Sequence, residues 1–179
     1  MNLDVRAMDA FEFVRLRQQA SGQIALADLP RFCDGLPQQP QGPEGMVQWS
    51  VRGEQGRHGE ALLVLDIQAR PVLTCQRCLA PFAWPVQAQA KLQLVRSEDE
   101  LDDDEGMLDD DALDAPEKVL GSQRFDLQAQ IEDELILSVP YIPKHEVCPG
   151  STGTTQQPED AQPARTSPFA VLEQLKSKK

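Results

Sequence analysis

The chain has 179 residues, of which 40% are hydrophobic and 5% aromatic, so its length fits one domain with a modest core and some appendages. Its 17 basic and 29 acidic side chains give a net charge of −12, but 11 of the carboxylates fall between residues 98 and 114, which leaves the rest nearly neutral. The longest apolar run covers only residues 61–65, which excludes a membrane-spanning helix of about 20 residues.

The cellular compartment can be inferred from the four cysteines and the start of the chain. Asp4 and Asp9 lie near the start, and no apolar stretch typical of a secretion signal follows them. We therefore expect a cytoplasmic protein whose cysteines stay reduced. In that setting a C-x2-C pair is more typical of a metal site, a catalytic pair or a structural turn than of a disulfide framework.

The N-terminal region predicts short elements. Asp9 is expected to cap an amphipathic helix, with Glu12 completing a capping-box pattern and Gly22 ending the helix. A short edge strand is predicted over residues 24–26. A second short helix, capped by its first residue Asp28, is predicted over residues 28–33, before a Pro- and Gln-rich loop.

Three stretches further on alternate between apolar and polar residues with a period of two: 47–52, 63–70 and 86–94. This period is typical of half-buried strands, and short connections between consecutive strands favour an antiparallel meander. Cys75 and Cys78 lie in the connection between the second and third stretch. The sequence therefore predicts a hairpin with two thiols at its tip.

The acidic run 98–114 is expected to be a solvated, disordered loop, because burying so many carboxylates would cost too much free energy. After Asp126 a helix is predicted, with Leu127, Ile131 and Leu135 on its buried stripe and Glu132 on its outward side together with its two acidic neighbours. This helix should be the main cover of the sheet.

The predicted fold class is α+β: an antiparallel β-meander or partly closed barrel, covered by one main helix, with a disordered acidic loop and a flexible C-terminal tail. The predicted organisation is a single domain over residues 1–148, a Pro-, Gly-, Thr- and Gln-rich linker over 149–167, and a tail motif over 168–179.

A complete tetrahedral zinc set can be assembled from Cys75, Cys78, His145 and Cys148, as C-x2-C and a distant H-x2-C. The 66 residues between the two pairs do not by themselves imply a shared geometry. Buried or turn cysteines are the structural alternative, since free cysteine is among the most buried residue types. Redox chemistry is disfavoured, because a thioredoxin-like pair opens a helix and strands flank this one. No cofactor is expected on balance, with zinc as the alternative.

Enzymatic activity has little support in the sequence. The chain has two histidines, His58 and His145, and no G-x-S-x-G, Walker loop, dinucleotide glycine pattern or H-E-x-x-H motif. We therefore expect a non-enzymatic protein without an evident small-molecule substrate. The arginines are too few and too mixed with acids for a strong nucleic-acid footprint.

Three blocks occur in order along the chain: CQRCLAPF at 75–82, DLQAQIEDELILSVPYIPKHEVC at 126–148, and SPFAVLEQLK at 167–176. Their combination and order resemble the YceD family, the large ribosomal RNA subunit accumulation proteins of bacteria. The resemblance implies a non-enzymatic role in accumulation of 23S ribosomal RNA, with ribosomal proteins as partners. Some relatives carry extra cysteines after the helix–proline segment that resemble a metal site, whereas this chain has Cys148 and the nearby His145.

The expected function is therefore a factor in biogenesis of the large ribosomal subunit that binds precursor ribosomal RNA or a basic ribosomal protein. The expected contact residues are Arg77 at the hairpin tip and the apolar tail residues Phe169, Val171 and Leu172. The alternative is a zinc-stabilised protein-interaction module unrelated to ribosomes.

Overall fold

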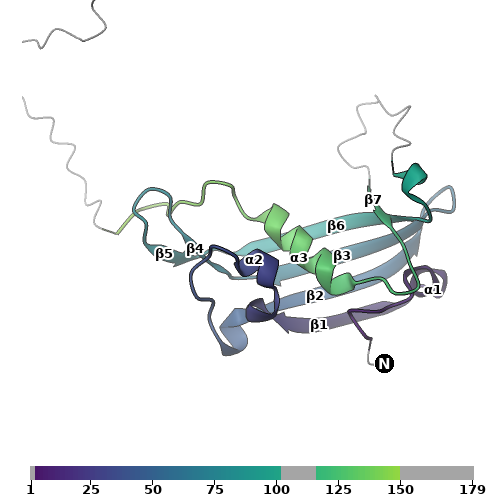
Figure 1. Cartoon of the computed structure of the whole chain (residues 1–179), viewed down its shortest axis with the longest axis horizontal. Coiled ribbons are helices and arrows are strands. Elements are labelled where there is room, and N and C mark those ends of the chain that lie inside the picture. The colour runs from purple at the N-terminus through teal and green to yellow at the C-terminus, as the bar shows by residue number, and fades with distance from the viewer. Residues whose placement is uncertain (1–2, 102–115, 150–179) are drawn as a thin grey trace, which may run out of the picture. The chain divides into compact units, whose positions relative to one another are not determined.

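The computed structural model describes residues 3–101 and 116–149 (Figure 1). Its helices are α1 (Ala10–Arg15), α2 (Pro30–Cys33) and α3 (Leu127–Ser138), with 3-10 turns η1 (Leu26–Asp28), η2 (Gly42–Gly45) and η3 (Glu98–Glu100). Its strands are β1 (Gln19–Ala25), β2 (Met46–Gln55), β3 (Ala61–Ala69), β4 (Val72–Thr74), β5 (Pro81–Ala83), β6 (Val86–Val95) and β7 (Glu117–Leu120).

The main sheet has five strands in the order β1-β2-β3-β6-β7. β1, β2, β3 and β6 pair antiparallel, so the predicted meander is confirmed. β7 pairs parallel to β6, and the sheet is mixed and open rather than a partly closed barrel. Such a pairing needs a long connection, and the chain supplies one because β7 begins 22 positions after β6 ends.

The register of β3 and β6 brings a row of apolar residues together on one face. Leu63 lies opposite Leu92, and Leu65 lies opposite Ala90. Because side chains alternate between the two faces of a strand, these pairs point to the same side of the sheet. Beyond Ala69 the same hairpin continues into a separate two-stranded ribbon of β4 and β5, which holds the two cysteines at its tip.

Helix α3 lies across one face of the sheet, as Figure 1 shows. Leu127, Ile131 and Leu135 are fully buried against the sheet, as their spacing predicts. Each such side chain contributes roughly 1.5–3 kcal/mol by leaving water. The helix begins where predicted, because the Asp126 carboxylate accepts a hydrogen bond from the backbone N–H of Ala129 at 2.9 Å.

The N-terminal prediction is correct at its start and wrong at its end. Asp9 caps α1 by accepting from the backbone N–H of Glu12 at 2.9 Å. The helix ends at Arg15, well before Gly22, because residues from Gln19 onward pair with β2 as strand β1. Sheet pairing thus takes over a segment whose local pattern favoured a helix.

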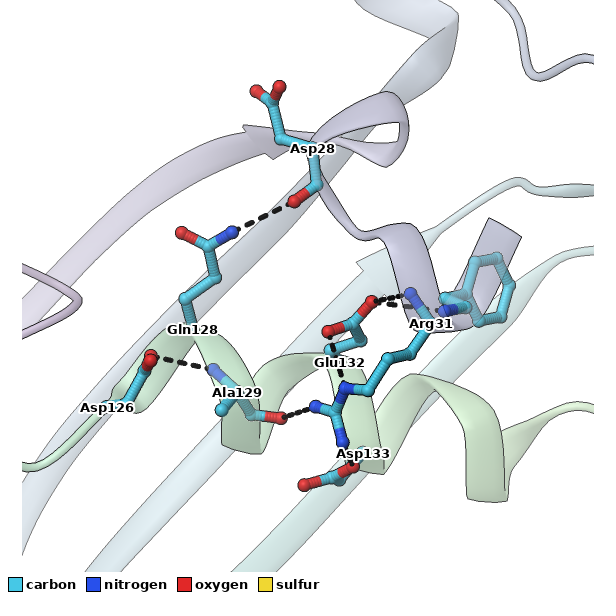
Figure 2. A network of polar contacts seen from close by, with 8 residues as sticks. Asp28, Arg31, Asp126, Gln128, Ala129, Glu132 and Asp133 are labelled. Carbon is cyan, nitrogen blue, oxygen red and sulfur yellow. Dashed lines mark hydrogen bonds and ion pairs between the residues drawn. The ribbon is translucent and has the colours of Figure 1, made fainter. Parts of the chain in front are cut away.

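Glu132 is buried, with 5% of its surface exposed, although the helical pattern predicted that it faces outward. One of its carboxylate oxygens accepts from the backbone N–H groups of Arg31 and Phe32, and the other from Arg31 Nε (Figure 2). The start of α2 is therefore capped by this carboxylate from α3, and not by Asp28 as predicted. The contact joins residues about 100 positions apart, so no local sequence pattern predicts it.

Two further predictions concern residues that lie largely outside the described ranges. These are the disordered character of the acidic run 98–114, of which the structure describes residues 98–101, and the linker and tail after Pro149. Among the described helices, none has the length and apolar character needed to cross a membrane.

Candidate metal centre

Cys75 and Cys78 are positioned by the tight turn that joins β4 to β5. The backbone N–H of Leu79 donates to the carbonyl of Cys75 at 2.8 Å, and the N–H of Cys75 donates to the carbonyl of Ala80 at 3.0 Å. Leu79 has a left-handed backbone, with φ of 61°, which is uncommon for a non-glycine residue. This turn curls the chain back so that both thiols face the same side.

The second pair, His145 and Cys148, is carried by the segment that leaves the end of α3. The backbone N–H of Gln76 donates to the carbonyl of Pro143 at 2.8 Å, which fixes this segment against the hairpin tip. The N–H of His145 points at the Sγ of Cys75 at 3.5 Å. These backbone contacts hold the Cys75–Cys78 pair next to the His145–Cys148 pair, and they do not depend on a metal ion.

The four ligand atoms of Cys75, Cys78, His145 and Cys148 all lie within 4.8 Å of one another. The Sγ atoms of Cys75 and Cys148 are 3.8 Å apart, and the Sγ of Cys78 is 3.4 Å from Nδ1 of His145. A tetrahedral zinc ion with Zn–S of about 2.3 Å and Zn–N of about 2.0 Å separates two sulfurs by about 3.8 Å, and a sulfur from a nitrogen by about 3.5 Å. These two spacings fit a zinc ion between the two pairs.

The local geometry argues against a disulfide and against a thioredoxin-like redox pair. None of the four cysteines, all of which lie in the described residues, forms a disulfide, and 3.8 Å between two sulfurs is far longer than a disulfide bond of about 2.05 Å. The residues after Cys78 form β5 and not a helix, so the geometry of a thioredoxin-like pair is absent from this hairpin. Three thiols and one imidazole that converge on one point form the donor set typical of structural zinc.

The electrostatics around Cys75 favour a metal-binding thiolate. Burial raises the pKa of the Cys75 thiol, but hydrogen bonds from the backbone N–H groups of His145, Cys78 and Arg77 outweigh burial and lower that pKa to about 5. At Cys78 the backbone N–H of Ala80 favours the thiolate, yet desolvation and the neighbouring thiols prevail and raise its pKa. A metal ion would remove that conflict, because it binds all the sulfurs as thiolates.

Arg77 holds the centre together from inside the C-x2-C pair. Its Nε donates to the Sγ of Cys148 at 3.0 Å, and its second guanidinium nitrogen donates to the carbonyls of His145 and Glu146 at 2.8 and 3.4 Å. The hydrogen bond to Cys148 raises the pKa of the Arg77 guanidinium, so this side chain remains cationic beside the thiols. One cationic side chain thus bridges the two halves of the site.

Aromatic rings close one side of the centre. The Phe82 ring lies 4.4 Å from the imidazole of His145, and Trp84 packs edge-on against Phe82 at 6.0 Å. These contacts restrain the orientation of the imidazole, which a ligand needs if its Nδ1 is to stay aimed at the metal. Sequence reasoning missed both rings, although Phe82 and Trp84 follow the cysteine turn directly.

Large apolar side chains are exposed beside the ligands. Leu79 is 73% exposed, Val147 77% and Tyr141 98%, with Ile142 at 54%. We call these four residues the knuckle surface. They come from the two segments that carry the ligands, and they offer apolar area beside the centre that a partner could cover.

The structure describes some of the predicted site residues and not others. It brings together Arg77 and the four candidate ligands. The predicted tail contacts Phe169, Val171 and Leu172 lie outside the described residues. His58, the second histidine, lies in the turn between β2 and β3, where its backbone N–H donates to Glu60 at 2.9 Å.

The fold and the cluster together define a small α+β protein with a centre of three cysteines and one histidine that could hold a metal such as zinc. The family model described as Large ribosomal RNA subunit accumulation protein YceD matches residues 63–176, and the chain belongs to this family. The matched stretch contains all four candidate ligands. No solved structure was found to match the chain.

Proposed function

We propose that this protein is a non-enzymatic, cytoplasmic factor in biogenesis of the large ribosomal subunit, which supports accumulation of 23S ribosomal RNA by binding precursor ribosomal RNA or a basic ribosomal protein. The family membership supports the role in accumulation of large-subunit ribosomal RNA. The binding partner is our inference from the surface of the molecule.

A zinc ion held by Cys75, Cys78, His145 and Cys148 is part of this proposal. The observation that carries it is the convergence of four ligand atoms within 4.8 Å from two segments that are far apart in sequence. When bound, the ion would act as a structural cross-link between the β4–β5 ribbon and the segment after α3. The chain's own residues would still shape the surface that the partner meets.

The proposed contact surface is the hairpin tip with Arg77 and the knuckle surface around it. The apolar side chains there would pack against a partner, and the zinc cross-link would keep them in fixed positions and so lower the entropic cost of binding. Phe169, Val171 and Leu172, which lie outside the described residues, form the second proposed contact on the basis of the sequence alone.

The alternative is a zinc-stabilised protein-interaction module with a partner unrelated to ribosomes. The same four-ligand centre and the same exposed apolar residues favour it. The ribosomal factor and the unrelated interaction module would have the same site. They differ in whether loss of the protein lowers the amount of large-subunit ribosomal RNA.

The test is the ratio of large- to small-subunit ribosomal RNA in a bacterial strain from which the gene is deleted, together with a sucrose-gradient profile of its ribosomal particles. We expect a selective loss of large-subunit RNA that the intact protein restores. An unchanged ratio and profile, under cold and heat stress as well, would reject the ribosomal role and leave the interaction module.

A further inference from the structure

A groove runs between helix α3 and strands β6 and β7, separate from the cysteine cluster. It encloses about 320 Å³. Six apolar residues line it: Leu65, Ala90, Leu92, Val119, Ile136 and Leu137. Helix α3 contributes Gln130, Asp133 and Glu134 to the lining as well, beside the row of fully buried residues that anchors the helix.

The edge of the groove that α3 forms exposes apolar side chains to solvent. Leu137 is 72% exposed and Ile136 is 38% exposed, whereas Leu135 beside them is fully buried. An exposed leucine at the margin of an apolar groove leaves area that a partner's side chain can cover. Covering such a side chain removes apolar area from water and so favours binding.

The rim of the groove is acidic. Glu117, Asp133 and Glu134 line it, and among the described residues no lysine, arginine or histidine does. The Asp133 carboxylate pairs with Arg31 at 2.6 Å, and Glu134 accepts from the hydroxyl of Ser138 at 3.3 Å. Lys118, next to Glu117, is paired with Gln93 of β6, so strand alternation directs its side chain to the opposite face of the sheet.

We propose that this groove binds a segment of a basic protein, in which one apolar side chain enters the groove and neighbouring lysines or arginines meet Glu117 and Glu134. Charge complementarity selects this occupant. Carboxylates repel the phosphates of RNA, while an apolar floor offers nothing to the sugar–phosphate backbone. The inference rests on the proposed function, and it selects a basic protein over RNA as the partner at this surface.

The test is a titration of the ¹⁵N-labelled full chain, followed by its amide chemical shifts, with a synthetic pentapeptide that has a central leucine between two lysines on each side. We expect saturable shifts at residues of α3, β6 and β7 that line the groove. A peptide with serine in place of the leucine carries the same charge and should bind at least severalfold more weakly, because it cannot fill the apolar floor.

Two variants, each with a matched control, locate the binding. Glu117→Gln with Glu134→Gln should weaken binding roughly 5- to 10-fold, or about 1 to 1.4 kcal/mol for the loss of two exposed ion pairs. Asp34→Asn with Glu44→Gln removes the same charge from exposed positions elsewhere and should leave binding unchanged. Leu137→Ser should weaken binding, and Leu16→Ser, at a leucine that is 48% exposed outside the groove, should not.

The proposal is overturned if the shifts spread over the surface without saturating, if the rim variant binds as the intact chain does, or if a single-stranded oligouridylate shifts the groove residues instead. Its failure can be told apart from failure of the ribosomal role. An unchanged ribosomal RNA ratio in the deletion strain rejects that role even when the peptide binds in the groove. Loss of peptide binding rejects the groove even when the ratio falls.

Discussion

Arg77 donates a hydrogen bond from its Nε to the Sγ of Cys148 at 3.0 Å, across 71 positions of the sequence. The arginine lies between two candidate ligands, Cys75 and Cys78, and reaches the fourth. A bound zinc ion with three thiolates and one neutral imidazole carries a net charge of −1, and a guanidinium in contact with one thiolate offsets it. Arg77 is therefore part of the centre and not only of the surface.

The first prediction concerns metal content. The chain purified under reducing conditions should contain one zinc ion per molecule, and Cys78→Ser should abolish it, because three ligands hold zinc far more weakly than four. Cys33→Ser is the matched control: this cysteine contacts the carbonyl of Leu26 at 3.1 Å and lies outside the cluster. Elemental analysis of the purified proteins measures both, and a zinc-free intact chain would contradict the prediction.

Removal of the metal should loosen one end of the molecule. A chelator should lower the melting temperature and release the segment after α3 from the β4–β5 ribbon, because a structural zinc ion supplies about 10–16 kcal/mol of apparent free energy in small zinc domains. The sheet, with its own buried core, should stay folded. Hydrogen exchange measures this directly: protection should fall at the N–H of Gln76 and stay high in β3. Equal loss in both places would show that the centre does not act locally.

Arg77→Gln should weaken zinc binding by about 10- to 100-fold, the usual effect of removing a partner of a metal ligand. Arg77→Lys should restore little, because lysine lacks the planar fork that reaches Cys148 and the two carbonyls together. Competition with a chromophoric chelator measures the affinity. Arg70→Gln removes an exposed arginine upstream of the ribbon and serves as the control. Equal affinity of the Arg77→Gln and Arg70→Gln chains would refute the bridging role.

Glu132→Gln should destabilise the fold by about 2 kcal/mol, because the buried carboxylate accepts three hydrogen bonds that an amide cannot all replace (Figure 2). Asp133→Asn, one position along, should cost less than about 1 kcal/mol, since that ion pair with Arg31 is half exposed. Urea denaturation of the two variants gives both free energies of unfolding. A lower stability of the Asp133 variant than of the Glu132 variant would contradict the buried capping role of Glu132.

Sequence reasoning worked where a local pattern decides the outcome. The alternation over 63–70 and 86–94 predicted β3 and β6, and the cap at Asp126 with Leu127, Ile131 and Leu135 predicted α3 and its buried stripe. Each of these signals lies within one element. The burial and the cap that these signals predict depend on residues only a few positions apart.

It failed where a distant segment decides the outcome. Strand β1 overrides the predicted end of α1 because β2 offers a pairing edge, and Glu132 turns inward because α2 offers unpaired N–H groups. The metal set could be assembled from the sequence, but its 66-residue gap left the geometry open. The hydrogen bond from Gln76 to Pro143 brings the two pairs together in space. The spacing of the cysteines and the histidine in the sequence does not predict this contact.

The most direct test of the central claim, that the cysteine centre serves the ribosomal role, uses the deletion strain with expression of Cys78→Ser or Cys33→Ser. Immunoblots would establish equal protein levels, and the ratio of large- to small-subunit ribosomal RNA would be measured. We predict that the Cys33 variant restores the ratio as the intact chain does, whereas the Cys78 variant leaves it low. Full restoration by the Cys78 variant would contradict the account.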